Sequence, residues 1–146
     1  MRGNRRDRLV VILSVMETII NYNGTEITLS SEYVGTARPC GDKYVKQQHC
    51  VTVWIGDEHV EFDFYCNDYE LGEDGLREAF YFFLSDGIAY DNANDIDDFQ
   101  SEFGYTKVSD CIKAYNGCKD AHDKWASLSD IDIYDICNWM QEVYNL

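Results

Sequence analysis

Residues 50–65 read CVTVWIGDEHVEFDFY, and this stretch decides the fold class because apolar side chains alternate with other side chains along it. Successive side chains of a β-strand point to opposite faces, so this alternation predicts two strands joined at Gly56-Asp57. A dipeptide with glycine first suits a two-residue type II′ turn. Such a turn pairs Val53 with Val60 and Val51 with Phe62.

The two faces of this hairpin differ in character. Trp54 and Tyr65 lie on the outer face among acidic side chains, which predicts either a second covering element or a binding surface there. The apolar face consists of Val51, Val53, Ile55, Val60, Phe62 and Phe64.

An earlier segment, ETIINYNGTEITLS at 17–30, predicts another hairpin. Its Asn23-Gly24 dipeptide is the strongest short signal for a type I′ turn. That turn places Tyr22 opposite Thr25 and Ile20 opposite Ile27. The two hairpins together predict a four-stranded antiparallel sheet.

Beyond Tyr65 the apolar period changes to that of α-helices. The whole pattern predicts an α+β fold, in which an antiparallel four-stranded sheet of two hairpins is followed by three to four helices packed on one face. The expected helices are 74–85 ending at a Gly87 C-cap, 95–103 between an Asn94 cap and Gly104, 107–126, and a terminal helix capped by Ser129. Their expected inward residues include Ile96, Phe99, Phe103, Val108, Cys111, Ile112, Tyr115, Cys118, His122, Trp125, Ile133, Cys137, Met140 and Tyr144.

The length of 146 residues predicts one domain over 16–146, with 1–15 as a possible N-terminal extension. The basic start and the apolar run 9–15 resemble a secretion signal, but no small-residue cleavage site follows. The run is also too short to span a bilayer. We therefore expect a cytoplasmic protein without membrane contact.

The six cysteines fit a reducing compartment, because three fall on apolar helix stripes and no C-x-x-C motif occurs. Four metal-ligating side chains would nevertheless lie near one another at strand ends, so a metal-stabilised domain stays an alternative. These are Cys40, His49, Cys50 and Cys66.

Charge is the unusual property of this chain. Its net charge is −15, and residues 57–146 carry 22 acids against five bases, whereas residues 1–56 carry five acids and seven bases. Such a surplus repels nucleic acid and anionic membranes and attracts basic protein surfaces. A solvated acidic exterior that only maintains solubility is the alternative.

Many of the acids gather in YDNANDIDDFQSEFGY at 90–105. An EF-hand loop counted from Asp91 fails, because Ala93 and Ile96 occupy positions that need an oxygen ligand and a glycine. Helical spacing instead places three carboxylates in a row on the water-facing flank of the 95–103 helix. They are Asp95, Asp98 and Glu102.

Catalytic motifs are missing from the sequence: it has no glycine-rich phosphate loop, no G-x-S-x-G and no H-E-x-x-H. His122 is expected in the core, and His59 has no nucleophile placed beside it by spacing. Carboxylates that bind Mg²⁺ for phosphoryl chemistry would need a polyanionic substrate, which this surface repels. We therefore predict a protein that is not an enzyme and needs no cofactor.

A resemblance adds to this interpretation. The segments YVKQQHCVTVWIGDEHVEFDFY, DDFQSEFGY and CIKAYNGCK resemble a loose family of short bacteriophage and plasmid proteins with a Y-x-V-T strand, an F-D-F return and a D-F-x-x-E-F-G-Y turn. The similarity covers about residues 33–125, and the family has no common activity or catalytic residues. It implies a mobile-element origin, where small acidic proteins often disable host nucleases, as anti-CRISPR and anti-restriction proteins do.

The leading hypothesis is an acidic surface that imitates nucleic acid and blocks the basic channel of a defence nuclease such as a Cas effector. The alternatives are a phage accessory interaction module that uses the aromatic sheet face, and the metal-stabilised domain. The expected partner contacts are Asp91, Asp95, Asp98 and Glu102, a second patch of Asp130, Asp132 and Asp135, and the aromatic pair Trp54 and Tyr65.

Overall fold

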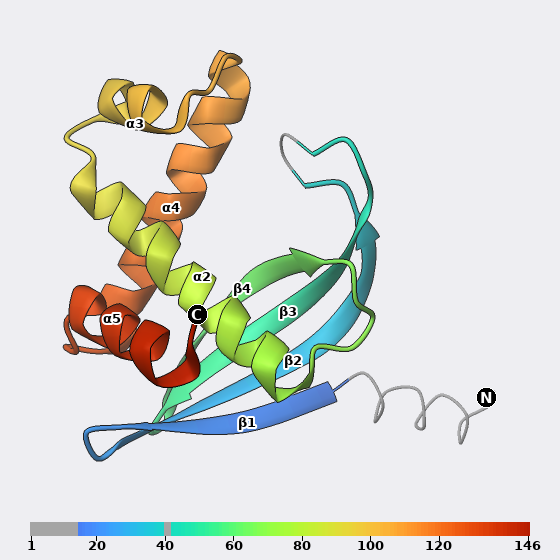
Figure 1. Cartoon of the computed structure of the whole chain (residues 1–146), viewed down its shortest axis with the longest axis vertical. Helices are drawn as coiled ribbons and strands as arrows, with labels where there is room; N and C mark the ends of the chain where they lie inside the picture. Colours follow the sequence, from blue (N-terminus) through green and yellow to red (C-terminus); the bar gives the residue numbers. More distant parts are fainter. Residues whose placement is uncertain (1–14, 40–41) are drawn as a thin grey trace. The chain divides into compact units, whose positions relative to one another are not determined.

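The computed structural model describes residues 15–39 and 42–146 (Figure 1). The fold class is α+β, as predicted, with four antiparallel strands in one sheet followed by four helices. The expected extension at 1–15 lies outside the described residues except for Val15, which begins the first strand. The elements are β1 (Val15–Tyr22), β2 (Thr25–Ala37), β3 (Lys46–Ile55), β4 (Glu58–Cys66), α2 (Gly72–Asn92), α3 (Ile96–Phe103), α4 (Val108–Leu128) and α5 (Ile133–Tyr144).

The chain divides into two compact units, which are described separately. The first contains the described residues of Met1–Pro39 and Tyr44–Ala79, and the second those of Cys40–Lys43 and Phe80–Leu146. The expectation of a single domain over 16–146 stays a prediction.

The sheet of the first unit has the strand order β1-β2-β3-β4. Asn23 and Gly24 both have positive φ, 50° and 88°, as a type I′ turn requires. Tyr22 pairs with Thr25 and Ile20 with Ile27. The first hairpin is therefore confirmed in turn and register.

The second hairpin is confirmed as well. Gly56 has a φ of 62° and Asp57 has no positive φ, which fits a type II′ turn with glycine first. The predicted pairs of Val53 with Val60 and Val51 with Phe62 are present. One irregularity, between Tyr33 and Gly35, shifts the register of β2 against β3.

One face of the sheet supplies the core of the first unit. The first turns of α2 belong to the same unit and add Leu76 and Ala79, both without exposed surface. Burial of this much apolar surface is the main stabilising term for such a unit. The fully buried strand residues are Ile20, Ile27, Leu29, Val51 and Val53.

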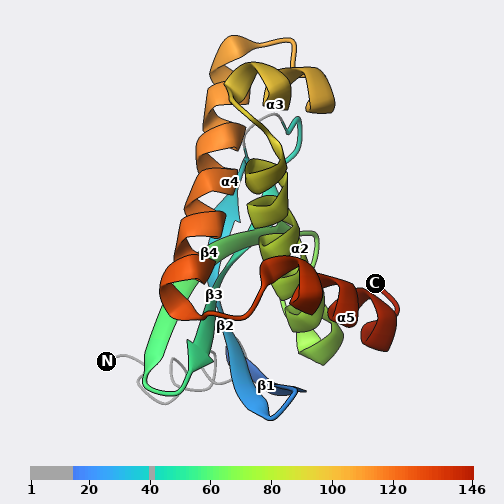
Figure 2. The same cartoon turned by 90° about the vertical axis from the view of Figure 1, so that its left-hand side faces the viewer.

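The second unit is built from helices. The later turns of α2 run beside α4, with α3 at one end of this pair and α5 at the other (Figures 1 and 2). The Phe80 and Trp125 rings pack with their centroids 5.8 Å apart. The indole of Trp125 donates a 2.8 Å hydrogen bond to the Ile131 carbonyl, so this buried ring also fixes the segment before α5.

The predicted end of α2 is wrong. The helix continues through Gly87 to Asn92, and Gly87 is a buried interior residue rather than a C-cap. A Cβ atom there would lie 2.7 Å from Cδ1 of Ile133 and 3.3 Å from Cα of His122. The glycine therefore permits the close approach of neighbouring chain segments.

Several positions predicted to face inward are exposed. On α4, Val108 is 66% and Ile112 is 42% exposed, whereas Ala121 and Leu128 are buried. Cys111 and Trp125 are buried as predicted, so the predicted stripe is correct at these positions and wrong at Val108 and Ile112. On α3, Phe103 is 50% exposed, although Phe99 is buried as predicted.

Two predicted helix caps are also wrong. Asp95 caps α3 in place of Asn94, and Asp132 caps α5 in place of Ser129. The Ser129 hydroxyl instead accepts a hydrogen bond from the Ile131 amide. None of the described helices combines the length and apolarity that crossing a lipid bilayer requires.

Candidate functional site

Helix α3 holds two of the expected contact residues in fixed positions. Asp95 accepts a 2.9 Å hydrogen bond from the Asp98 amide, and Asp98 accepts a 3.2 Å bond through Oδ2 from the Asn94 amide. These bonds satisfy amides that the start of a helix leaves without partners. Gly104 ends the helix with a φ of 68°, and its amide donates to Gln100. The carboxylates are therefore exposed and at the same time oriented by the backbone.

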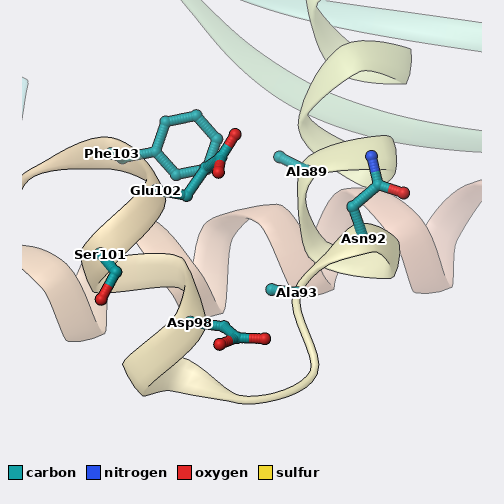
Figure 3. A pocket seen from close by; sticks show the side chains of 7 residues that line it. All are labelled: Ala89, Asn92, Ala93, Asp98, Ser101, Glu102 and Phe103. Carbon is teal, nitrogen blue, oxygen red and sulfur yellow. The ribbon is translucent and has the colours of Figure 1, made fainter.

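A pocket of about 420 Å³ lies between α3 and the end of α2 (Figure 3). Asp98 and Glu102 extend from α3 toward the side on which Ala89 and Asn92 lie. The half-exposed ring of Phe103 forms another wall. The remaining lining residues are Ala93 and Ser101.

No lysine or arginine of the described chain forms an ion pair with an α3 carboxylate. Three of the described cations form ion pairs within their own helix. Arg77 pairs with Glu73 and Asp74 on α2, and two pairs on α4 join Lys119 to Asp123 and Lys124 to Asp120. Within the described residues, no direct ion pair with lysine or arginine therefore neutralises the α3 carboxylates, which favours attraction of an external cation.

Asp91, which was expected to act together with the α3 acids, has different neighbours. Its Oδ2 lies 2.7 Å from the Tyr134 hydroxyl, and its Oδ1 lies 3.6 Å from Nε2 of His122. The same hydroxyl lies 2.8 Å from the side-chain oxygen of Asn92. A hydroxyl has one hydrogen, and the carboxylate is the stronger acceptor, so Tyr134 donates to Asp91. Asp91 therefore links α2 to α5.

This cluster has the residue types of an acid–base site, but its environment argues for a structural role. Burial, and then the carboxylates of Asp91 and Asp132, raise the pKa of Tyr134 to about 12, so the phenol stays protonated at neutral pH. His122 is shared between Asp91 and Asp123, at 3.6 Å and 3.1 Å. His122 is thus a partly exposed residue that connects helices, and the expectation of a core position is only partly met.

The second acidic patch lies at the start of α5. Asp132 accepts hydrogen bonds from the amides of Tyr134 and Asp135, at 2.9 Å and 3.1 Å, so it is a helix cap. Asp130 and Asp135 are exposed. Acids at this end complement the helix dipole, which gives them a structural explanation that does not need a partner.

Trp54 and Tyr65 share a face of the sheet, but the structure does not bring them together. The Trp54 ring packs against the His59 ring across the strands, tilted by 31° with centroids 4.3 Å apart, while Tyr65 pairs with Gln48. Six residues of β3 separate these two positions, about 20 Å at the rise of a strand. Burial, and then Asp63, raise the pKa of Tyr65. Trp54 is 38% and Tyr65 is 36% exposed. Because of the distance between them, these two aromatic side chains are separate surface features.

The described residues expected for a metal site do not form one cluster, although His49 and Cys66 contact the same backbone carbonyl. His49 is buried and its Nε2 lies 2.8 Å from the Asp68 carbonyl, whereas the next residue, Cys50, points to the opposite face of the strand. The Cys66 thiol donates to the same carbonyl. Within 15–39 and 42–146, no three histidine, cysteine or acidic side chains gather closely enough to hold an ion. Cys40 lies outside the described residues.

The pocket and the role of Tyr134 had no clear signal in the sequence. Phe103 was expected in the core, and Ala89, Asn92 and Ala93 were not singled out. The small residues Ala89, in the last turn of α2, and Ala93, just after its end, were the available signal for an unfilled surface. No family model, curated protein or solved structure matches this chain. The likeness to phage and plasmid proteins therefore stays a prediction.

Proposed function

We propose that this protein binds a basic nucleic-acid-binding protein and occupies the surface where that partner binds phosphates. The observation that carries the proposal is the α3 surface, where exposed carboxylates are oriented by helix-capping bonds and no cation of the described chain pairs with them. The acidic surplus of the whole chain, −15, adds long-range attraction toward a basic partner.

The mechanism is competition. A nuclease channel lined with lysine and arginine displaces counterions from the phosphates that it binds, and a surface of fixed carboxylates competes for the same lysine and arginine side chains. Association is then fast at low ionic strength and weakens as salt screens the charges. No chemical step by the inhibitor is needed, so we propose a protein that is not an enzyme.

The resemblance to phage and plasmid proteins suggests the target class, a nucleic-acid-targeting defence nuclease in the cytoplasm of a bacterial host. A Cas effector loaded with guide RNA is the first candidate. Contacts from Asp95, Asp98 and Glu102 form the proposed primary surface. Asp130, Asp132 and Asp135 form a second one, to which Asp91 is connected through Tyr134.

The test measures DNA cleavage by purified defence nucleases, including guide-loaded Cas effectors, with increasing amounts of this protein at low and high salt. Inhibition that weakens with salt, and that Glu102→Lys reduces, is expected. Glu26→Lys, the same charge reversal at an exposed position of β2, is the control and should inhibit almost as well as the unmodified protein. If no nuclease shows salt-sensitive inhibition, the proposal is wrong.

A second function is favoured by a separate observation on the sheet. Ile19, Thr28, Trp54 and His59 stand in register across all four strands, and two of them, Ile19 and Trp54, are large apolar side chains that are 53% and 38% exposed. Such a row suits a protein–protein contact that depends little on charge. Self-association or partner binding that survives high salt and is lost in Trp54→Ala would support this function. Sedimentation velocity at low and high salt measures the self-association.

A further inference from the structure

We infer that the pocket between α3 and the end of α2 receives an arginine side chain of the basic partner. The inference rests on the proposed function and deepens it, because it names the site and the chemical group that it recognises. The pocket combines an unfilled volume of about 420 Å³, two carboxylates and an exposed aromatic ring. Binding pockets for small ligands begin at about 300 Å³, so one side chain has room.

The carboxylates are placed to bind a cation. The backbone amide of Asn94 donates a hydrogen bond to Oδ2 of Asp98, and this bond holds the carboxylate in position. The other carboxylate oxygen, Oδ1, can accept a hydrogen bond from a ligand. Glu102 lies one turn further along α3 and lines the same pocket (Figure 3). A guanidinium offers five donors in a planar fork, which suits two neighbouring carboxylates better than the point charge of an ammonium.

The ring of Phe103 favours the side chain of arginine over a metal ion as the bound cation. The ring is 50% exposed beside the carboxylates, and it also packs at a tilt of 46° against the Phe99 ring, with centroids 4.7 Å apart. A guanidinium stacks on an aromatic face, and the methylene groups of arginine cover apolar surface. Ala89 and Ala93 leave the opposite wall short and apolar, so the stem of the side chain lies against methyl groups.

An anionic ligand is excluded by the same arrangement, since both charged groups of the pocket are carboxylates without a cation of the described chain paired to them. A hydrated metal ion would use the carboxylates but would gain nothing from the ring and the alanine methyl groups. An arginine side chain uses all of these features.

The experiment uses the full chain and three synthetic peptides of alternating glycine with arginine, lysine or citrulline. Citrulline keeps the shape of arginine and lacks its charge. Binding is followed by amide chemical shifts in NMR and by anisotropy of labelled peptides. We expect the arginine peptide to bind more tightly than the lysine peptide, the citrulline peptide not to bind, and the shifts to map to 89–103.

The variants assign the site. Glu102→Gln and Phe103→Leu should each weaken binding of the arginine peptide about five-fold, the loss expected for one exposed ion pair or one cation–π contact. Asp97→Asn is the matched control, because it removes the same charge from the same helix at a residue that does not line the pocket. The affinity of this variant for the arginine peptide should change by less than about two-fold. Circular dichroism checks that Phe103→Leu is folded, and Glu102→Gln tests the site independently.

The possible results distinguish the assignment of the arginine pocket from the proposed inhibition of a nuclease. Equal weakening by Asp97→Asn and Glu102→Gln, or shifts that map elsewhere, would overturn the pocket assignment while salt-sensitive binding still supports the proposed function. Specific binding of the arginine peptide at 89–103 without inhibition of any nuclease would support the pocket and contradict the proposed function. Failure of the arginine peptide to bind at low salt would overturn the pocket assignment, whatever the nuclease assay shows.

Discussion

The phenol oxygen of Tyr134 lies 2.7 Å from Oδ2 of Asp91, although 43 positions separate these residues in the chain. This bond connects the end of α2 to the start of α5, and His122 of α4 approaches the other oxygen of the same carboxylate. Asp91 therefore contributes to the stability of the helical unit. A loss of binding in an Asp91 variant would consequently not identify a contact, which is why the binding tests use Glu102.

Removal of the Tyr134 hydroxyl should destabilise the protein. Tyr134→Phe removes the hydrogen bond to the Asp91 carboxylate, and water can partly replace the lost donor. The free energy of unfolding should therefore fall by about 1 kcal/mol, which lowers Tm by about 3 °C. Tyr69→Phe is the control, because this exposed hydroxyl has no hydrogen bond in the described chain. Thermal unfolding by circular dichroism measures both. Equal Tm values for the two variants would show that the bond contributes nothing.

Gly87 should not tolerate alanine, although alanine favours a helix by about 1 kcal/mol. The new methyl group would lie 2.7 Å from Cδ1 of Ile133 and 3.3 Å from Cα of His122, and the backbone atom cannot move aside cheaply. Gly87→Ala should therefore lower the free energy of unfolding by about 1–2 kcal/mol. Urea titration measures it.

Two further variants make this prediction specific. Gly117→Ala on α4 is the matched control, because nothing lies within 4 Å of the added methyl group, and it should stabilise the protein. Ile133→Val removes the Cδ1 atom and should recover part of the loss in the double variant. If Gly87→Ala stabilises as much as Gly117→Ala, the helices are not in close contact at Gly87.

Asp86 should make stability depend on pH. Desolvation raises the pKa of its carboxyl from 3.8 to about 6. The folded protein therefore holds this proton more tightly than the unfolded chain, so the carboxyl destabilises the fold above about pH 6 and is neutral in both states below about pH 3.8. The Asp86 side chain is nevertheless exposed at the surface of α2, and screening by water therefore reduces the effect.

Asp86→Asn should accordingly raise Tm by about 2 °C near pH 7.5 and leave it almost unchanged near pH 4. Asp97→Asn, an equal change of charge at an exposed position of α3, controls for the reduction in net charge. The difference between the two variants at the two pH values is the measured quantity. A larger gain from Asp86→Asn at the acidic pH would contradict the sign of the shift.

The sheet could be predicted because its signals are local. Asn23-Gly24 and Gly56-Asp57 each determine a turn within two residues, and the period-two pattern then fixes the register. Helix ends were harder, since a glycine at a C-cap and a glycine at a close approach look alike in sequence, and Gly87 is the second kind.

The candidate site was harder to predict from the sequence than the sheet, because it depends on contacts between distant segments. The α3 acids were recognised from helical spacing, but their orientation depends on Asp95 being the cap, one residue later than predicted. Contacts between distant segments have no local signal. The partners of Asp91 come from α4 and α5, and the exposure of Phe103 depends on where the end of α2 lies within the same unit.

The same surplus of carboxylates should give folding and binding opposite responses to salt. At −15, the folded chain repels itself, and screening lowers this repulsion, so Tm should rise as NaCl increases from about 20 to about 200 mM. Binding of the arginine peptide should weaken over the same range, because screening then reduces attraction. Matching series in NaCl and KCl distinguish screening from the effect of one particular ion. A Tm that falls with salt would show that local pairs, such as Lys119 with Asp123, outweigh the general repulsion, and the acidic surface would then be less available to a partner than proposed.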